Sequence, residues 1–201
     1  MGIHIPEILE AVGVDSLTAH VEGDSGWKSR LFELLLRAQP VGAEERCDSV
    51  TCHRATFMYG VLWEHDQLNK GTHDTLHEWL GIANIEVLQH LALMARERHV
   101  VTAEGDAGDL DHLDRLALPI TFVHGAENVV FVPEATQRTI ERLRAANPGV
   151  PYARHVIAGY GHLDPIVGAF AARDVYPLIF GHLEMVERLR PTERLRPMGT
   201  R

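Results

Sequence analysis

The fold of this chain is decided by residues 118–164, which contain LPITFVHG at 118–125, PEATQRTIERLRAANPG at 133–149 and YARHVIAGYGHLD at 152–164. The first and last of these segments begin with short runs of apolar and β-branched residues, which favour buried strands. The middle segment opens with a proline, has apolar residues at helical spacing and closes at Asn-Pro-Gly, which predicts a helix. Strand, helix and strand in this order predict a right-handed crossover between two parallel strands.

Two parallel strands imply a larger sheet. Parallel strands are normally covered on both faces and occur in sheets of several strands. A last helix is expected after the second strand, with Asp174 as its cap and Pro177 in its first turn. Residues 112–186 are therefore predicted to form a βαβα end of an α/β core whose other strands are missing.

The hundred residues before this unit have helical rather than strand-like patterns. Apolar residues recur at helical spacing, and no segment alternates as a half-exposed strand would. Asn84 is a suitable cap for the last of the expected helices. These helices cover residues 5–12, 27–38, 57–62, 76–80 and 85–95. A Gly- and Asp-rich stretch at 103–111 marks the boundary, so residues 1–111 are predicted to be a helical, cap-like region.

The composition excludes several classes of protein. The chain has 201 residues, of which 45% are hydrophobic, and this excludes a disordered chain and a collagen-like repeat. No apolar run reaches the roughly 18 residues of a membrane helix, and the start lacks a secretory signal, so we expect no membrane span and a cytoplasmic location. The two cysteines, Cys47 and Cys52, are expected to be thiols.

Charge is unevenly distributed along the chain. Residues 187–201 carry five Arg and two Glu, a net charge of +3, so the total of −9 leaves −12 for the rest. An acidic body repels phosphate backbones, and nucleic acid is therefore not expected as a partner. The basic tail, which two prolines interrupt, is expected to be disordered.

Two polar loops follow the predicted strands. Reactive groups in open parallel sheets gather beyond the carboxyl ends of the strands, which here lead into HGAEN at 124–128 and GYGHLD at 159–164. A His on one loop and an acidic residue on the other are the arrangement that orients an imidazole as a general base. A structural loop histidine is the alternative, and the pattern alone favours neither.

These segments carry a family resemblance. The order strand, His-Gly-x-x-acid, helix, strand, Gly-x-Gly-His resembles the end of α/β-hydrolases, and residues 161–179 are similar to the tail of the acid-lipase branch. Residues 52–78 resemble the hydrolase module that is fused behind flavin-dependent glucose-methanol-choline oxidoreductases of the cholesterol-oxidase type. The resemblance spans residues 3–186. It implies that the fold class is α/β, the carboxyl-terminal portion of an α/β-hydrolase fold.

The resemblance also implies roles for four residues in the two loops. His162 would be the base of the catalytic triad, and Asp164 would brace its loop. Asn128 occupies the position of the triad acid, with Glu127 beside it. Because Asn can hold a His tautomer but cannot stabilise an imidazolium by charge, either Glu127 is the acid or the pair is weak.

The nucleophile that the resemblance requires does not appear in this sequence. α/β-Hydrolases carry a serine in Gly-x-Ser-x-Gly at a strand-to-helix elbow, ahead of the acid and the His. The nearest match is Gly23-Asp24-Ser25-Gly26, which lacks the last glycine and a preceding strand. The first six strands and the elbow are therefore expected to be absent, and residues 3–110 would correspond to the cap inserted after the sixth strand.

Three functions follow as hypotheses. The first is the carboxyl-terminal half of a serine hydrolase directed at an apolar ester, lipid or sterol-like substrate. His162 would be its general base, and the Ser would come from an upstream half or another chain, so this chain would be inactive alone. The second is a non-catalytic module that binds an apolar ligand or a flavin oxidoreductase domain. We expect no cofactor in either case.

The third hypothesis is a metal-binding helical protein. His73 and His77 are one helical turn apart, and Cys47, Cys52, His53 and His65 lie upstream. An i, i+4 His pair can chelate zinc, but His-x-x-x-His-Glu is not the metalloprotease motif and Cys-x4-Cys-His is an unusual spacing. A structural role for these histidines, without a metal, is the expectation.

Overall fold

The computed structural model describes residues 46–189 continuously, together with residues 7, 10, 11, 13, 16–18, 34, 36 and 42. Most of the helices expected over 5–12 and 27–38 lie outside the described residues. Ser25 and residues 190–201 of the expected tail also lie outside them.

The predicted strand–helix–strand unit is confirmed. β3 (Ile120–Gly125) and β4 (Tyr152–Ile157) pair in parallel, with Ile120 opposite Tyr152 and Gly125 opposite Ile157. α7 (Pro133–Ala146) connects them and packs on both strands, with Pro133 in its first turn as expected. Ile140 and Leu143 of α7 pack against Tyr152 and form the core of this unit.

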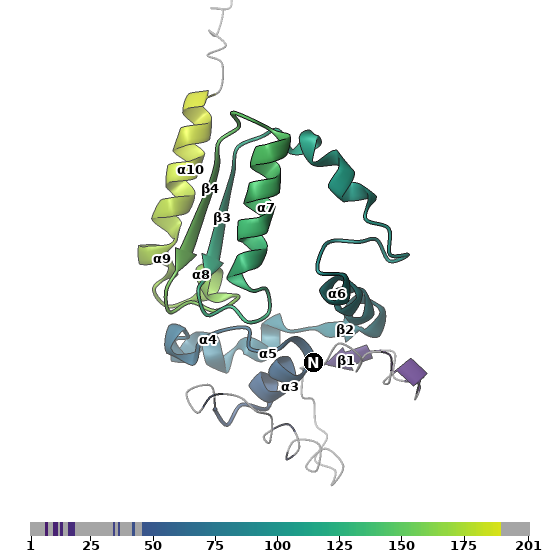
Figure 1. The fold of residues 1–201 in the computed structure, drawn as a ribbon. Helices are drawn as coiled ribbons and strands as arrows, with labels where there is room; N and C mark the ends of the chain where they lie inside the picture. The colour runs from purple at the N-terminus through teal and green to yellow at the C-terminus, as the bar shows by residue number, and fades with distance from the viewer. Residues whose placement is uncertain are drawn as a thin grey trace, which may run out of the picture.

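Three helices follow β4: α8 (Asp164–Val167), α9 (Ala171–Asp174) and α10 (Tyr176–Leu189). α7 and α10 flank the strand pair on opposite sides (Figure 1). Thr121 of β3 and His182 of α10 form a hydrogen bond of 2.8 Å between Oγ1 and Nδ1. The expectation that Asp174 caps the last helix is wrong, since Asp174 ends α9, and its carboxylate accepts a hydrogen bond from the hydroxyl of Tyr160.

From residue 46 to the strand pair the chain is mainly helical, as expected, and its elements are short. They are α3 (Val50–Tyr59), the 3-10 helix η2 (His65–Gln67), α4 (Lys70–Asp74), α5 (Leu76–Trp79), α6 (Ile85–Glu97) and the 3-10 helix η3 (Gly108–Leu116). Asn84 caps α6 as expected, and its side chain accepts from the N–H of Glu86. Gly60, with φ of +88°, ends α3 earlier than the expected helix over 57–62.

The expectation of no strand in this region is wrong. β1 (Ser16–Thr18) and β2 (Ile82–Asn84) form an antiparallel pair, with Leu17 opposite Ala83. Each strand has three residues, which is too short for an alternating pattern to stand out from the helical spacing around it. Ala83 is buried between two exposed neighbours and joins Met58, Ile85 and Leu88 in a small core.

The helical region lies across the carboxyl ends of β3 and β4 (Figure 1). Its largest core contains Cys52, Leu62, Trp63 and Leu76, and Val130 and Leu163 from the two loops after the strands pack against it. The backbone is joined there as well, since the N–H of Leu163 donates to the carbonyl of Leu62 at 2.7 Å. The described chain is thus mixed α/β, with a helical layer over the strand ends.

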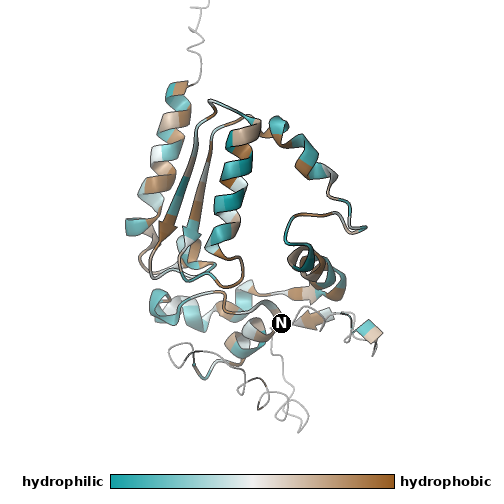
Figure 2. Cartoon of the chain, in the orientation of Figure 1, coloured by the Kyte–Doolittle hydropathy of each residue, from teal (hydrophilic) through white to brown (hydrophobic). Residues whose placement is uncertain are grey.

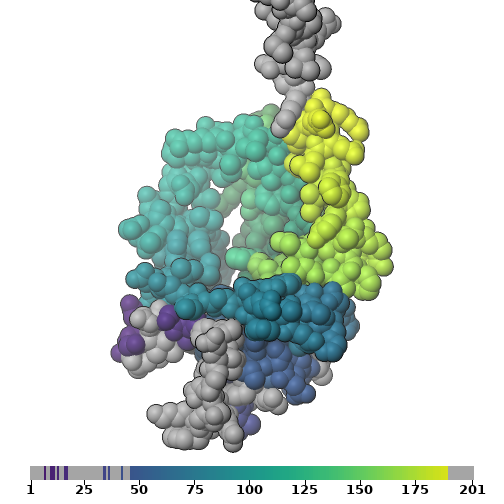
Figure 3. Space-filling model, turned by 180° about the vertical axis from the view of Figure 1, so that it is seen from behind, coloured from purple at the N-terminus to yellow at the C-terminus, as the bar shows by residue number. Residues whose placement is uncertain are grey.

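The strand pair is incompletely covered. In β3 only His124 and Gly125 are buried, and in β4 only Tyr152 is buried. Segment 98–116 arches away from the strands, and Figure 3 shows an opening between it and the body of the molecule. α10 also leaves apolar side chains exposed, and Figure 2 shows hydrophobic bands along it. Within the described ranges, no third strand pairs with β3 or β4.

Among the described helices, none is both long enough and apolar enough to cross a bilayer.

Candidate functional site

The structure brings Asn128 and His162 together at the carboxyl ends of β3 and β4. Asn128 follows β3 and is buried, and its Nδ2 lies 3.1 Å from Nδ1 of His162. The parallel register places both loops at the same edge, because Gly125 and Ile157 end the two strands side by side. Across the described residues, this is the one side-chain hydrogen bond to His162.

The direction of this hydrogen bond is set by the backbone. Asn128 Oδ1 accepts from the N–H groups of Val130 and Phe131, at 3.1 and 2.9 Å. The amide therefore turns its Nδ2, a donor, toward His162, so Nδ1 of the imidazole must accept and its proton lies on Nε2. A Ser-His-Asp triad needs the opposite tautomer, with the proton on Nδ1 and Nε2 free to accept from the serine.

His162 is half-buried beside an aromatic ring. The ring of Phe131 lies 5.2 Å from the imidazole, centre to centre, at an interplanar angle of 47°. Burial lowers the pKa of His162 below its usual value, and the nearby His124 lowers it further. With no carboxylate bonded to it, His162 is thus held neutral near physiological pH.

Asp164 links the loop that carries His162 to neighbouring backbone. It is fully buried, and its Oδ2 accepts from the N–H of Gly161 at 2.6 Å and from that of Glu64 at 2.9 Å. Two backbone donors on one carboxylate oxygen are charge-assisted hydrogen bonds. Asp164 therefore ties the His162 loop to the helical layer and does not contact the imidazole by a hydrogen bond.

The side chain of Glu127 bonds to the backbone of the loop after β4. Its Oε1 accepts from the N–H of Gly159 at 3.3 Å in an exposed position, and its own N–H donates to the carbonyl of Tyr160. The structure thus pairs His162 with Asn128 rather than with Glu127. Of the serines, Ser49 caps α3 by accepting from the N–H of Cys52, and Ser16 begins β1.

The two loops approach so closely that one position excludes a side chain. A Cβ on Gly125 would lie 2.1 Å from the carbonyl oxygens of both Tyr160 and Gly161. Glycine is therefore needed at the end of β3 for the loop after β4 to cross it. The proximity of Asn128 to His162 depends on this crossing.

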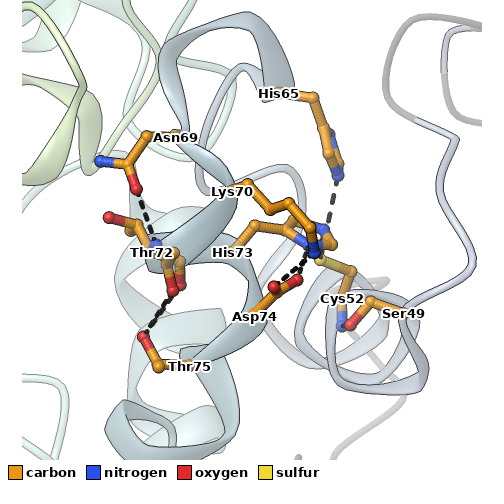
Figure 4. A network of polar contacts seen from close by, with 10 residues as sticks. Ser49, Cys52, His65, Asn69, Lys70, Thr72, His73, Asp74 and Thr75 are labelled. Atoms are coloured by element: carbon orange, nitrogen blue, oxygen red, sulfur yellow. Dashed lines mark hydrogen bonds and ion pairs between the residues drawn. The ribbon is translucent and has the colours of Figure 1, made fainter.

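A second cluster of polar side chains lies in the helical layer. One ligand atom from each of Cys47, Cys52, His65 and His73 lies within 4.8 Å of the others. Cys52 Sγ is 3.2 Å from His73 Nε2 and 3.8 Å from His65 Nε2, and Figure 4 shows both rings turned toward it. Hydrogen bonding to Cys52 lowers the pKa of the Cys47 thiol to about 3, against an opposing effect of burial, and His65 lowers it further.

The sequence offered His73 and His77 as a possible chelating pair; in the structure His73 joins the cluster with Cys47, Cys52 and His65, and His77 is not part of it. His77 is exposed and lies 3.9 Å from Glu78, measured from Nε2 to Oε1. α4 ends at Asp74 and His77 lies in α5, so the two histidines are not on one continuous helix. His53 instead uses its Nε2 to contact the carbonyl of Cys47 at 2.8 Å.

Comparisons with protein-family models, with curated proteins and with solved structures find nothing that matches this chain.

Proposed function

We propose that this chain supplies the carboxyl-terminal part of an α/β-hydrolase type of fold directed at esters or lipids, with His162 as the general base. The main support is the contact of 3.1 Å between Asn128 and His162 at the ends of two adjacent parallel strands. Their order along the chain, acid position first and His second, is the order that such hydrolases use.

The incomplete cover of the strand pair supports the same proposal. Two-stranded parallel sheets with half-exposed strands are unusual, because parallel strands are normally buried on both faces. Most residues of β3 and β4 keep partial exposure. Further strands beside this pair would bury them and would bring a nucleophile elbow to the edge where His162 lies.

A second candidate is a non-catalytic module that binds an apolar ligand or a flavin oxidoreductase domain. The direction of the Asn128–His162 hydrogen bond favours it, because a proton on Nε2 makes His162 a donor rather than a base. To act as a base, the imidazole must change tautomer and lose the hydrogen bond to Asn128, at a cost of about 1–3 kcal/mol. That cost slows a general-base reaction by roughly 5- to 150-fold without forbidding it.

The experiment that separates the two uses an activated aryl ester. The protein is assayed alone and co-expressed with a polypeptide that carries a Gly-x-Ser-x-Gly elbow, in the native sequence, as His162→Ala and as His112→Ala. His112 is an exposed histidine of η3 and is the matched control. The general-base proposal expects a burst of product only in the co-expressed complex, kept by His112→Ala and lost in His162→Ala.

Two results would overturn that proposal. A burst from the chain alone would place the nucleophile within these residues. Turnover by the complex that survives His162→Ala would remove the general-base role, and no turnover together with unchanged ligand binding in His162→Ala would support the non-catalytic module.

A further inference from the structure

We infer that Cys47, Cys52, His65 and His73 form a four-coordinate binding site for Zn²⁺ in the helical layer. The sequence expectation was that no metal is bound. The observation behind the inference is the convergence of two thiols and two imidazoles, from four separate positions in the chain, on a common point. This inference is independent of the proposed hydrolase function, since none of the four residues contacts His162.

The geometry fits a tetrahedral ion. With Zn–S of about 2.3 Å and Zn–N of about 2.0–2.1 Å, neighbouring ligand atoms in a tetrahedral site lie about 3.3–3.8 Å apart. The two distances from Cys52 Sγ, 3.2 Å to His73 and 3.8 Å to His65, are close to this range. All four ligand atoms lie within 4.8 Å of one another, so only small shifts of side chains are needed to close the site.

The donor set selects the metal. Two cysteines and two histidines are a common set for structural zinc, whereas magnesium and calcium prefer oxygen ligands. Two thiolates balance the charge of one Zn²⁺, which reduces the cost of placing the ion among partly buried groups. Four protein ligands fill the tetrahedron and leave no position for substrate, which indicates a structural rather than a catalytic site.

A carboxylate lies near the second nitrogen of one ligand. His73 turns Nε2 toward Cys52, and its other nitrogen, Nδ1, lies 4.0 Å from the carboxylate of Asp74. Histidines that bind zinc usually donate a hydrogen bond from the second nitrogen to such a carboxylate, and a small shift of Asp74 would be needed to form it here. Lys70 holds Asp74 in turn by an ion pair of 2.5 Å, and Figure 4 shows both side chains beside His73.

The cluster is accessible from the surface. A hollow of about 430 Å³ is lined by residues next to the ligands, including Asp48 and Asp74, and also by His73 itself. The two carboxylates that line it attract cations. Cys52 is only 3% exposed, so an ion that enters is shielded from water on the inner side.

The site would hold together elements that are too short to be stable alone. Cys47 precedes α3, Cys52 lies in its first turn, His65 begins η2 and His73 lies in α4. α4 has five residues and η2 has three, and isolated helices shorter than about 12–15 residues are marginal in water. One ion that joins α3, η2 and α4 would stabilise this layer, because metal binding is coupled to folding.

The test measures zinc in the full chain, purified under reducing conditions and dialysed against Zn²⁺ without chelator. We expect one equivalent per chain. Cobalt in place of zinc should give thiolate charge-transfer bands and the strong d–d bands of a tetrahedral ion. Cys47→Ser, Cys52→Ser and His73→Ala should each lose stoichiometric binding, and Asp74→Ala should weaken it about 10- to 100-fold.

His77→Ala is the matched control, because His77 lies on the same surface but outside the cluster. It should keep one equivalent of zinc. Cys52 is buried, so Cys52→Ser could fail to fold for reasons unrelated to zinc. In that case Cys47→Ser, whose position is half-exposed, decides the result. The inference would be overturned if the native sequence bound no zinc, or if Cys47→Ser and His73→Ala still bound one equivalent as the native sequence does. A disulfide between Cys47 and Cys52 in the reduced preparation, detected by thiol labelling, would do the same.

Discussion

Asn128 donates a hydrogen bond from Nδ2 to Nδ1 of His162 at 3.1 Å, because its Oδ1 is already bonded to two backbone N–H groups. A carboxylate at this position would keep the two backbone contacts with one oxygen and accept from His162 with the other. The identity of a single atom thus decides on which nitrogen of the imidazole the proton lies.

The variant Asn128→Asp should reverse the hydrogen bond. The new carboxylate favours the imidazolium and the Nδ1–H tautomer, so the pKa of His162 should rise from its present lowered value. Nitrogen NMR of the imidazole, followed over a pH titration, measures the tautomer and the pKa together. Asn128→Ala is the control, which removes the amide without adding charge. A pKa that is unchanged in Asn128→Asp would show that the side chain does not face His162.

Asp164→Ala should destabilise the fold strongly. The substitution leaves the N–H groups of Gly161 and Glu64 without their buried acceptor, and each loss costs about 1–3 kcal/mol, so a total of about 2–6 kcal/mol is expected. Urea unfolding measures the change. Asp114→Ala, at an exposed position of η3, should stay within about 0.5 kcal/mol of the native sequence. Equal effects of the two substitutions would contradict the bracing role of Asp164.

Gly125→Ala should disrupt the crossing of the two loops. The added Cβ would overlap two backbone carbonyl oxygens, which cannot move aside as a flexible side chain can. We expect a loss of about 3 kcal/mol or more in the free energy of unfolding. Gly181→Ala is the matched control, since nothing lies within 4 Å of a Cβ there and α10 continues through it. That variant should be neutral or more stable by up to about 1 kcal/mol.

Tyr160 should make stability fall at alkaline pH. Burial raises the pKa of Tyr160 to about 12, and the hydrogen bond to Asp174 adds to the rise. Since the folded pKa is above the unfolded value of 10.0, this stabilisation is complete below pH 10 and is lost progressively as pH rises toward 12. Denaturant unfolding at a series of pH values should show a shallower alkaline decline in Tyr160→Phe. Parallel declines in the two proteins would refute the prediction.

Tyr160→Phe should also change the pKa of Asp174, which titrates at acid pH. Hydrogen bonds from Arg173 first and from Tyr160 second lower the pKa of Asp174 to about 2. That stabilisation is present above pH 3.8 and is lost as pH falls toward 2. Tyr160→Phe removes one of the two donors, so NMR of the Asp174 carboxyl should report a higher pKa. A pKa that stays at about 2 would assign the whole effect to Arg173.

The sequence was sufficient to predict the strand pair and its helix. Pro133, the Asn-Pro-Gly end of α7 and the β-branched runs act locally, and the observed bounds agree with the expectation closely. Asn84 was a correct cap for the same reason. Local patterns failed for the three-residue strands β1 and β2, which exist only because they pair with each other.

The candidate sites were predictable in part. The motif order brought Asn128 and His162 to one edge, but the direction of their hydrogen bond depends on backbone N–H groups that no spacing reveals. The sequence named Cys47, Cys52, His65 and His73 among possible metal ligands, but it favoured a structural role because their spacing matches no known zinc motif. Their convergence depends on η2, which turns His65 toward Cys52. Helical spacing suggested His77 as the second ligand beside His73, whereas the structure places Cys47, Cys52 and His65 beside it.

The contacts between residues 62–67 and 159–169 determine how these two segments unfold locally. The carbonyls of Leu62 and Gln67 accept from backbone N–H groups of the His162 loop and of the segment after α8, and Gln67 Nε2 donates to the carbonyl of Gly159 at 2.7 Å. Two stretches a hundred residues apart therefore protect each other's amides, and hydrogen exchange should detect them as one cooperative unit. A ligand that orders the segment around His65 would then slow exchange around His162 as well, without touching it.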